Sequence, residues 1–293
     1  MPKGKIIKAL SGFYYVLSEG QLIQCRGRGV FRKNKVTPLV GDEVVFQAEN
    51  ETDGYILEVK DRKNELVRPP IANVDQAILV FSSVEPEFST VLLDRFLVLI
   101  EYNRIDPLIC VTKMDLASSD EVAKMKEFAA QYEAVGYPVI LTSSETEAGI
   151  EQLLPYLKDK ISVFAGQSGV GKSSLLNVIR PDLDLKTNEI SSSLGRGKHT
   201  TRHVELISIG DGLIADTPGF SSLEFLEIEA EDLNYCFPEI EKVSEDCKFR
   251  GCLHLSEPKC AVKEAVENNE IPAYRYEHYK DFLQEIKDRK PRY

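Results

Sequence analysis

The sequence predicts a multi-domain protein with an N-terminal β-barrel, a central α/β domain and a C-terminal, mainly helical domain that binds a metal. Three observations favour this fold class: short β-rich runs crowd the first part of the chain, strand and helix patterns alternate in its middle, and cysteines cluster near its end. A chain of 293 residues has room for three domains, each with a core of its own. We place these domains at residues 1–66, 71–222 and 223–293.

The charges of the chain are unevenly distributed. A formal net charge of −11 argues against uniform binding of nucleic acid, yet Glu19 is the sole acidic residue between Lys3 and Lys35, and the last residues are again basic. The segment 224–246 is strongly acidic. Because no apolar run approaches the length of a membrane span, we expect a cytoplasmic protein without a membrane partner, and we expect a monomer.

The barrel is predicted from five short β-rich runs that turn residues separate. They are Lys5–Leu10, Phe13–Leu17, Gln21–Arg26, Glu43–Gln47 and Tyr55–Lys60. Five short strands suggest an OB-fold, a barrel that often binds nucleic acid. The basic loop at 26–33 is expected to clamp an RNA backbone, with Phe31 available for stacking, although a solvated basic loop remains the alternative. Arg68-Pro69-Pro70 is expected to close this domain as a stiff linker.

The central domain is predicted from apolar runs that alternate with helix patterns. The expected strands are Gln76–Phe81, Leu108–Val111, Val139–Thr142, Ile161–Ala165 and Leu213–Ala215. The helices between them are expected near Ser89 to Ile100, at Asp120–Val135, at Ile150–Leu157 and from Ser174. This rhythm indicates a mostly parallel sheet with helices on both faces.

The segment from Gly166 to Ser173 reads G-x-x-x-x-G-K-S and lies between a predicted strand and a predicted helix, the context that a phosphate-binding loop requires. Its glycines let backbone N–H groups face an anion, Lys172 would reach the outer phosphates, and Ser173 would bind Mg²⁺. The predicted nucleotide-binding residues of this loop are Gly166, Gln167, Ser168, Gly169, Val170, Gly171, Lys172, Ser173 and Ser174.

A base-recognition motif precedes this loop in the chain. Thr112-Lys113-Met114-Asp115 follows a predicted strand and approximates the guanine-specificity motif N-K-x-D, with threonine in place of asparagine. An aspartate carboxylate accepts from the N1–H and the 2-amino group of guanine, which adenine does not offer there, and such a pair discriminates strongly. Ser143 and Ser144 follow the next predicted strand and fit a second base-contacting loop. GTP and GDP are therefore the expected ligands.

Switch elements follow the phosphate loop. Asp216-Thr217-Pro218-Gly219 comes after a predicted strand, where Asp216 would hold Mg²⁺ and the Gly219 N–H could sense the γ-phosphate. A threonine upstream, Thr201 in preference to Thr200, would bind Mg²⁺ when triphosphate is present. His199 either orients the attacking water or contacts RNA or backbone. The predicted Mg²⁺ ligands are Ser173, Thr201 and Asp216, and the predicted catalytic residues are Lys172, Thr201, His199 and Gly219.

The C-terminal cysteines have the spacing of a metal site. Cys247, Cys252, His254 and Cys260 make a Cys₃His set, which is typical of a closed, tetrahedral structural zinc site. A full set leaves no open position, so a catalytic zinc is not expected. The other cysteines, Cys25, Cys110 and Cys236, are expected to be buried thiols, and the aromatic face of the last helix, at 273–288, is expected to pack in a core.

The order of the nucleotide motifs is unusual. Ordinary small GTPases run from phosphate loop to switch threonine, D-x-x-G, N-K-x-D and base loop, whereas here the last two come first, which a circular permutation explains. The chain resembles the circularly permuted, ribosome-associated GTPases of bacteria, the RsgA/YjeQ type. The resemblance rests on the basic N-terminal barrel, Leu92-Leu93-Asp94-Arg95-Phe96, Thr112–Asp115, Gly166–Ser174, 195–201, 216–220 and the cysteine cluster. It implies an OB-fold, a permuted GTPase domain, a zinc domain, and binding to the small ribosomal subunit and its rRNA during late maturation.

The expected activity is slow hydrolysis of GTP. Efficient small GTPases place a glutamine after D-x-x-G to orient the attacking water, and this chain has Phe220 there. We therefore expect turnover that the small subunit stimulates, and we hypothesise that contact with the γ-phosphate at Gly219 reorients the metal-binding domain. Two alternatives remain: an ATP-using enzyme on the same loop, and an RNA-binding module whose nucleotide site is vestigial.

Overall fold

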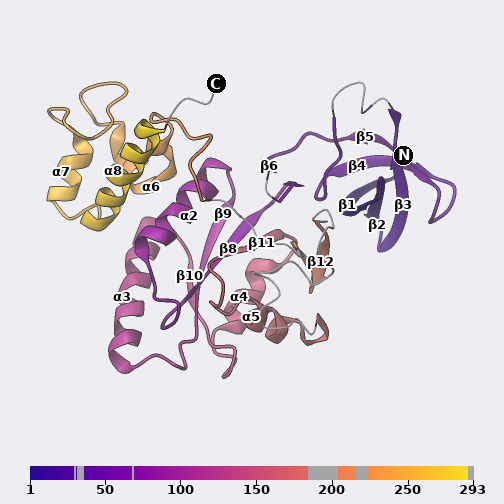
Figure 1. Cartoon of the computed structure of the whole chain (residues 1–293), viewed down its shortest axis with the longest axis horizontal. Helices are drawn as coiled ribbons and strands as arrows, with labels where there is room; N and C mark the ends of the chain where they lie inside the picture. The colour runs from indigo at the N-terminus through magenta and orange to yellow at the C-terminus, as the bar shows by residue number, and fades with distance from the viewer. Residues whose placement is uncertain (30, 32–35, 68, 184–203, 216–222, 290–293) are drawn as a thin grey trace.

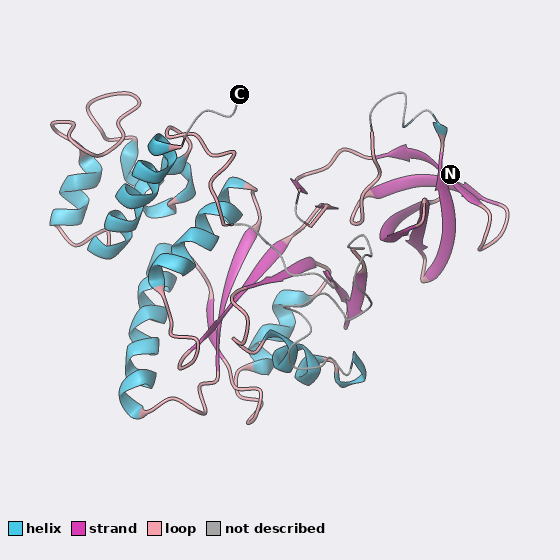
Figure 2. Cartoon of the chain, viewed as in Figure 1, coloured by secondary structure: helices cyan, strands magenta, loops and turns pink. Residues whose placement is uncertain are grey.

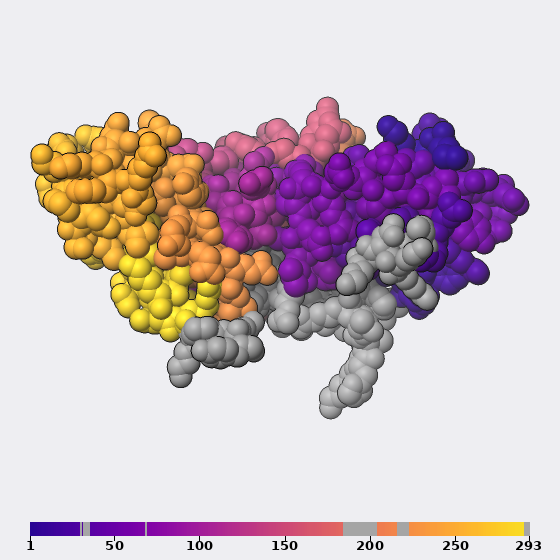
Figure 3. Space-filling view, turned by 90° about the horizontal axis from the view of Figure 1, so that it is seen from above, coloured from indigo at the N-terminus to yellow at the C-terminus, as the bar shows by residue number. Residues whose placement is uncertain are grey.

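The protein is represented by a computed structural model that describes residues 1–29, 31, 36–67, 69–183, 204–215 and 223–289. Its elements form three units: a barrel, an α/β domain, and a group of helices (Figure 1). The barrel and the group of helices lie at opposite ends of an elongated molecule, with the α/β domain between them (Figure 3). Within the described ranges, no helix combines the length and the apolar character that crossing a bilayer requires.

The N-terminal unit is a closed barrel with the strand order β1-β2-β3-β5-β4, as the sequence predicts for an OB-fold. Its strands are β1 (Lys3–Leu10), β2 (Phe13–Ser18), β3 (Gln21–Gly27), β4 (Glu43–Ala48) and β5 (Gly54–Val59). Strand β1 pairs with both β2 and β4, which closes the barrel. Alternate residues point inward, and Val16, Cys25 and Ile56 are fully buried there.

Two expectations for this unit are wrong. Phe31, expected to be free for stacking, is 9% exposed and packs into the apolar core of the barrel, where burial of its ring outweighs a surface role. Pro69 and Pro70, predicted in a stiff linker, lie instead in the turn of a hairpin between β6 (Glu65–Leu66) and β7 (Ile71–Ala72). Proline lacks the N–H that a strand ladder needs and is favoured in turns.

The central unit is a sheet with the order β10-β9-β8-β11-β13-β12, in which β12 is antiparallel and the other pairs are parallel. Its strands are β8 (Gln76–Ser82), β9 (Asp106–Thr112), β10 (Val139–Leu141), β11 (Ile161–Ala165), β12 (Leu206–Ile209) and β13 (Gly212–Ala215). Strand β11 lies in the middle, with strands from earlier in the chain on one side and strands from later in the chain on the other. The sequence did not predict β12.

Helices cover both faces of this sheet (Figure 2). The helices are α2 (Thr90–Tyr102), α3 (Ser119–Val135), α4 (Ile150–Leu157) and α5 (Lys172–Ile179), followed by a 3₁₀ turn η1 (Pro181–Leu183). Leu79 and Phe81 of β8 pack with α2 and α3, whereas Ile78 and Val80 pack with α4 and α5. This alternation is why β8, buried on both faces, reads as a continuous apolar run.

The C-terminal unit packs on helix α2. It contains η2 (Leu233–Cys236), α6 (Pro238–Ser244), α7 (Ala261–Glu267) and α8 (Ala273–Asp288). Val98 and Leu99 of α2 belong to its apolar core, together with Tyr279 and Phe282 of α8. The prediction that the aromatic face of α8 packs in a core is therefore confirmed, and α2 is buried by the sheet on one side and by this unit on the other.

A buried polar cluster joins α2 to the same unit. Asp94 accepts hydrogen bonds from Arg275 Nη1, from His278 Nδ1 at 2.6 Å and from the Tyr132 hydroxyl at 2.9 Å. Arg275 also donates to both carboxylate oxygens of Glu239 on α6. The cluster therefore links α2, α3, α6 and α8 through groups that are closed off from water.

Candidate functional site

The phosphate loop follows β11 and leads into α5, as the sequence predicts. Gly166, Gly169 and Gly171 have φ angles of 140°, 81° and 97°, which favour glycine because a side chain would be strained there. A Cβ on Gly166 would also lie 2.1 Å from the carbonyl oxygen of Val80. The glycine spacing of the loop is thus required by backbone geometry and by its close approach to β8.

Lys172 is the buried cation of this loop. Its Nζ donates to the carbonyl oxygens of Gly166 at 2.9 Å and Gln167 at 2.5 Å. Burial lowers the pKa of Lys172 to about 8, because the charged form loses hydration. Ser173 is buried next to it, whereas Gln167, Ser168 and Gly169 are exposed at the surface of the loop. The ammonium group is therefore held inside the curve of the loop, where an added anion would stabilise its charge.

Thr112 contacts the phosphate loop itself. Its buried hydroxyl lies within hydrogen-bonding distance of the carbonyl oxygens of Phe81, at 3.0 Å, and Val170. A hydroxyl donates to one acceptor at a time, so Thr112 ties the end of β9 either to β8 or to the loop. The sequence predicts Thr112 as a nucleotide contact; the structure shows that its side chain supports the loop that binds phosphate.

The other residues of the base motif lie at the same edge of the sheet. Lys113 donates from Nζ to the Gly169 carbonyl oxygen at 2.8 Å, and the N–H of Met114 donates to the Thr142 carbonyl oxygen at 3.2 Å. The Ser143 hydroxyl donates to Asp115 Oδ1 at 2.5 Å. Asp115 is exposed, and a carboxylate can accept several hydrogen bonds, so it retains capacity for donors of a base. Ser144 follows, half-buried.

Ser143 also fixes its own loop. Its Oγ accepts from the N–H groups of Glu145 at 3.2 Å and Thr146 at 3.1 Å. The loops after β9 and β10, which are far from the phosphate loop in sequence, therefore converge with it at the carboxyl edge of the parallel strands. Sheets of this type place ligand sites at that edge.

The switch residues lie outside the described part of the chain. This applies to His199, Thr200, Thr201, Asp216, Gly219 and Phe220. Strand β13 ends at Ala215 and runs parallel to β11, with Ile214 opposite Ser162. The chain therefore leaves β13 at the edge that carries the phosphate loop, and the roles of these residues stay predictions.

The four metal-ligating residues predicted from the sequence do come together. The ligand atoms of Cys247, Cys252, His254 and Cys260 all lie within 4.8 Å of one another. Cys247 Sγ is 3.9 Å from Cys260 Sγ, and His254 Nδ1 is 3.6 Å from Cys247 Sγ and 3.4 Å from Cys260 Sγ. A tetrahedral ion with usual bond lengths separates two sulfurs by about 3.8 Å and sulfur from nitrogen by about 3.6 Å. The group fits a metal ion.

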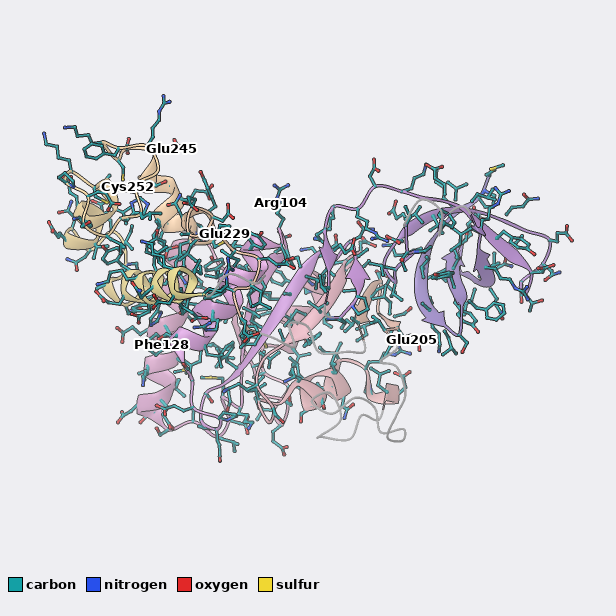
Figure 4. The ribbon with its side chains drawn as sticks, turned by 45° about the horizontal axis from the view of Figure 1, so that its top comes forward. Arg104, Phe128, Glu205, Glu229, Glu245 and Cys252 are labelled. Atoms are coloured by element: carbon teal, nitrogen blue, oxygen red, sulfur yellow. The ribbon has the colours of Figure 1, made fainter. Side chains whose placement is uncertain are left out.

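A second residue orients the histidine of this group. His254 Nε2 is 3.0 Å from Asn234 Oδ1, and donation from Nε2–H leaves Nδ1 as the ligand atom. Asn234 precedes the cysteine cluster by more than ten residues and belongs to no motif, so sequence reasoning missed it. Cys252 lies at the far end of the molecule from the barrel (Figure 4). The metal centre is therefore distant from the barrel and belongs to the helical unit.

Comparison with known proteins decides the family. The model described as RsgA GTPase matches residues 59–226, more than half of the chain, and the model described as RsgA N-terminal domain matches residues 3–56. The chain belongs to the RsgA family. Within it, the chain is 69% identical to the small ribosomal subunit biogenesis GTPase RsgA of Bacillus cereus and 65% identical to that of Bacillus subtilis, with complete coverage of both partners in each comparison.

Two solved structures agree with this fold. The chain superposes on YloQ, described as a circularly permuted GTPase, with a TM-score of 0.88 at 60% identity, covering 100% of this chain and 97% of that one. It superposes on YjeQ from Thermotoga maritima with a TM-score of 0.89 at 41% identity, covering 99% of each chain. The predicted family and the predicted permutation of the GTPase domain are confirmed.

Proposed function

We propose that the protein hydrolyses GTP to GDP and phosphate, and that it acts as a GTP-driven switch in the late maturation of the small ribosomal subunit. The observation that carries this proposal is that the base motif, through Thr112 and Lys113, contacts the phosphate loop, while its Asp115 pairs with Ser143 at the same edge of the sheet. The relatives that match the chain over its full length are named as GTPases of small-subunit biogenesis. The proposed setting is the cytoplasm, with GTP, GDP and rRNA as partners of a monomer.

The proposed chemistry is attack of water on the γ-phosphorus, with GDP as the leaving group. Lys172 binds the outer phosphates, and Ser173, Asp216 and Thr201 would hold Mg²⁺, which would neutralise the charge that develops on the phosphate oxygens. The N–H of Gly219 would contact the γ-phosphate. The phenyl ring of Phe220 can neither accept a proton nor position a water molecule, so another group is needed. His199 would orient the attacking water when a partner is bound.

The proposed selectivity for guanine rests on Asp115. Replacing Asp115→Asn exchanges an acceptor for a donor, which matches xanthine, whose C2 carbonyl stands where guanine has its amino group. The variant should lose GTP binding by ~10²-fold or more and gain binding of xanthosine triphosphate, because the amide N–H group of the new side chain would face the N–H donors of guanine without an acceptor between them. Binding of ATP in competition with GTP by the native protein would favour the alternative of an ATP-using enzyme.

The proposed role of Lys172 predicts a dependence of GTP affinity on pH. Bound phosphate stabilises the ammonium form, so binding is full below the pKa of about 8 and weakens as the pH rises through that value. Titration calorimetry between pH 7 and 9 should show affinity falling toward about tenfold per pH unit at the upper end. The Lys172→Met variant is the control, since it should bind weakly and with a flatter profile.

The proposed metal is one structural zinc, because three thiolates and an imidazole form a closed set without a position for substrate. Zinc would fix the loop from Cys247 to Cys260 against helix α8, where the hydroxyl of Tyr276 donates to the His254 carbonyl oxygen. The metal therefore has a structural role in the unit that packs on α2.

The deciding experiment compares GTP turnover with and without purified small ribosomal subunits. We expect slow basal turnover and clear stimulation by the subunit, and we expect the Lys172→Ala variant to lose turnover while it keeps affinity for RNA. Turnover that subunits leave unchanged would refute the partner-activated switch. Native protein that binds RNA without any GTP turnover would favour the module with a vestigial nucleotide site.

A further inference from the structure

A cavity of about 750 Å³ lies at the amino edge of the central sheet, where strands β8, β9 and β10 begin. This edge is opposite the one that carries the phosphate loop, which follows the carboxyl end of β11. The lining includes Glu101, Asp106, Tyr137, Tyr156 and Lys160, together with three prolines. The volume is within the range of small-molecule sites, about 300–1,000 Å³. The cavity is therefore large enough for a ligand of its own, separate from the nucleotide.

Three helices end beside this cavity. Helices that connect parallel strands run antiparallel to those strands, so the C-termini of α2, α3 and α4 lie at the edge where the strands begin. The C-terminus of a helix carries a partial charge of about −0.5, which a basic residue in the last turn commonly balances. None of these three helices has a basic residue in its last turn. The cavity therefore faces three negative helix ends that lack this balance.

Glu101, in the last turn of α2, adds a full negative charge to the same wall. It is half-buried, and burial raises the pKa of Glu101 because the charged form loses hydration. Arg275, a nearby cation, forms its ion pairs with two other carboxylates. The buried hydroxyl of Tyr137 beside Glu101 has no hydrogen-bond partner of good geometry among the described residues. A ligand that donates N–H groups to both would satisfy polar groups that are costly to leave alone.

Two cations line the cavity, but neither balances Glu101. Lys160 Nζ lies 3.5 Å from Gln76 Oε1 and 3.9 Å from Asp106 Oδ2, so its charge acts on Asp106. Arg104 is exposed, and its side chain points away from the body of the molecule (Figure 4). The side chain of Asp106 is 79% exposed and is free to contact a ligand as well as Lys160.

The rest of the lining decides which kind of cation fits. A metal ion needs several ligand atoms close together, and within the described ranges Cys247, Cys252, His254 and Cys260 alone form such a group. The prolines and the partly exposed ring of Tyr156 offer apolar surface for methylene groups and an aromatic face for an ammonium group. A phosphorylated ligand would meet Glu101, Asp106 and the negative helix ends. A cation with an aliphatic chain fits better than a metal ion or an anion.

We propose that this cavity binds a linear aliphatic polyamine. One ammonium group donates to Glu101 and the Tyr137 hydroxyl, the chain lies along the prolines, and a second ammonium group contacts Asp106. The occupant would touch the GTPase domain and also Pro238 of α6, which belongs to the helical unit. The proposal does not depend on GTP hydrolysis, because no residue of the cavity belongs to the phosphate loop or the base motif.

The test titrates spermidine into full-length protein, free of nucleotide and RNA, by isothermal titration calorimetry at 150 mM salt. We expect one saturable site. Glu101→Gln should weaken binding by roughly 10- to 100-fold, as loss of a hydrogen bond to a charged group does, and Tyr137→Phe by roughly 2- to 10-fold, as loss of a neutral one does. Asp106→Asn should weaken binding by at most about fivefold, because an exposed ion pair contributes little.

A matched control separates this site from general attraction by a chain of net charge −11. Glu245→Gln removes the same charge from an exposed residue that does not line the cavity, and it should bind spermidine within about twofold of the native protein. Equal weakening by Glu245→Gln and Glu101→Gln overturns the proposal, as does a native protein without saturable binding. Complete displacement of spermidine by Mg²⁺ at equal concentration of charge overturns the assignment to a polyamine.

Hydrogen exchange locates the ligand. Spermidine should increase protection in the last turns of α2 and α3 and in residues 136–138, with the phosphate loop unchanged. Protection elsewhere without a change at these positions overturns the site. Thermal unfolding without ligand is the control for the fold: Glu101→Gln and Tyr137→Phe should unfold at the native temperature or above it, because each removes a buried group that lacks a good partner. Lack of GTP turnover by the native protein would refute the proposed function and leave this titration to decide the polyamine site.

Discussion

Two fully buried aspartates join the parts of this molecule, and water reaches their arginine partners to different degrees. Asp42, in the barrel, accepts from Arg62 Nε and Nη2, each at 2.7 Å, and the side chain of Arg62 is 20% exposed. Asp94, in helix α2, accepts from Arg275, whose side chain is 1% exposed. Both carboxylates have no exposed surface, so the difference lies in the cation.

The exposure of the arginine therefore distinguishes the two ion pairs, one on the barrel side and one on the metal-binding side of the molecule. Arg62 also donates to the Thr37 carbonyl oxygen and to Glu65, so it ties the barrel to the hairpin leading into the GTPase domain while its charge stays partly hydrated. Arg275 is enclosed by the rings of Tyr132, Tyr137 and Phe237 at 5.5, 5.6 and 4.9 Å. A guanidinium enclosed in this way depends on every one of its hydrogen-bond partners, because water cannot replace a lost partner. The stability of the metal-binding unit should therefore fall more on loss of its aspartate than the stability of the barrel does.

Removal of the metal should have the largest effect. Binding of structural zinc is worth about 10–16 kcal/mol in zinc-finger peptides and is coupled to folding. A strong chelator at pH 7 should therefore abolish protection from hydrogen exchange in residues 223–289, and α2 should lose the packing of Val98 and Leu99. The barrel is the internal control and should keep its protection. Equal loss of protection in the barrel and in the helical unit would contradict the idea that the two are attached to the GTPase domain independently of each other.

Replacement of Asp94→Ala should have the second effect in size. It leaves Arg275 paired with Glu239 alone and removes the acceptor of His278 Nδ1 and the Tyr132 hydroxyl. Breaking one side of a buried ion pair costs about 3–5 kcal/mol, so amides of α8 should exchange with an opening free energy lower by that amount. Asp94→Asn keeps the shape and some hydrogen bonds and should cost less. A change below about 1 kcal/mol would show that Arg275 finds another partner.

Replacement of Asp42→Ala should cost less than Asp94→Ala. Hydrogen bonds to a charged group contribute about 1.5–3 kcal/mol, and the partly hydrated Arg62 retains water and Glu65 when Asp42 is lost. Exchange of β1 and β4 amides should report a decrease in that range, with α8 unchanged. If Asp42→Ala lowered the opening free energy by more than Asp94→Ala does, the partly exposed Arg62 pair, and not the enclosed Arg275 pair, would be the more important of the two.

Much of the fold could be predicted because local patterns and burial agree. The barrel strands and helices α4 and α8 follow from runs of apolar residues and from turn residues between them, and strand β8 is buried on both faces, so its apolar run is unbroken. The phosphate loop was predictable because its glycines meet backbone demands, such as the approach of Gly166 to Val80. Positions that only glycine can occupy produce a pattern of glycines that can be recognised in the sequence.

The buried aspartate–arginine pairs and the contacts that support the phosphate loop were not predictable from the sequence. They connect residues far apart in the chain, and no motif of fixed spacing marks them. Asp94 lies in a segment that resembles the family, yet nothing in the sequence pairs it with Arg275, which lies 181 positions away. Thr112 looked like a base contact because it stands in a base motif, whereas its hydroxyl faces the phosphate loop. The burial of Phe31 likewise depends on how the barrel closes over its ring, which no local pattern shows.

The contact between Lys8 and Glu205 should have the smallest effect of all. These residues form a bridge between β1 of the barrel and the strand that begins with Leu206, and Glu205 lies on the side of the GTPase domain that faces the barrel (Figure 4). The ion pair measures 2.7 Å, but its side chains are about a third exposed. Exposed pairs contribute about 0–1 kcal/mol and are screened by salt. Lys8→Met should therefore change the opening free energy of β12 by less than about 1 kcal/mol, and less still at 1 M salt. An effect as large as that of Asp94→Ala would mean that this bridge, rather than the Arg62 contacts, holds the barrel in place.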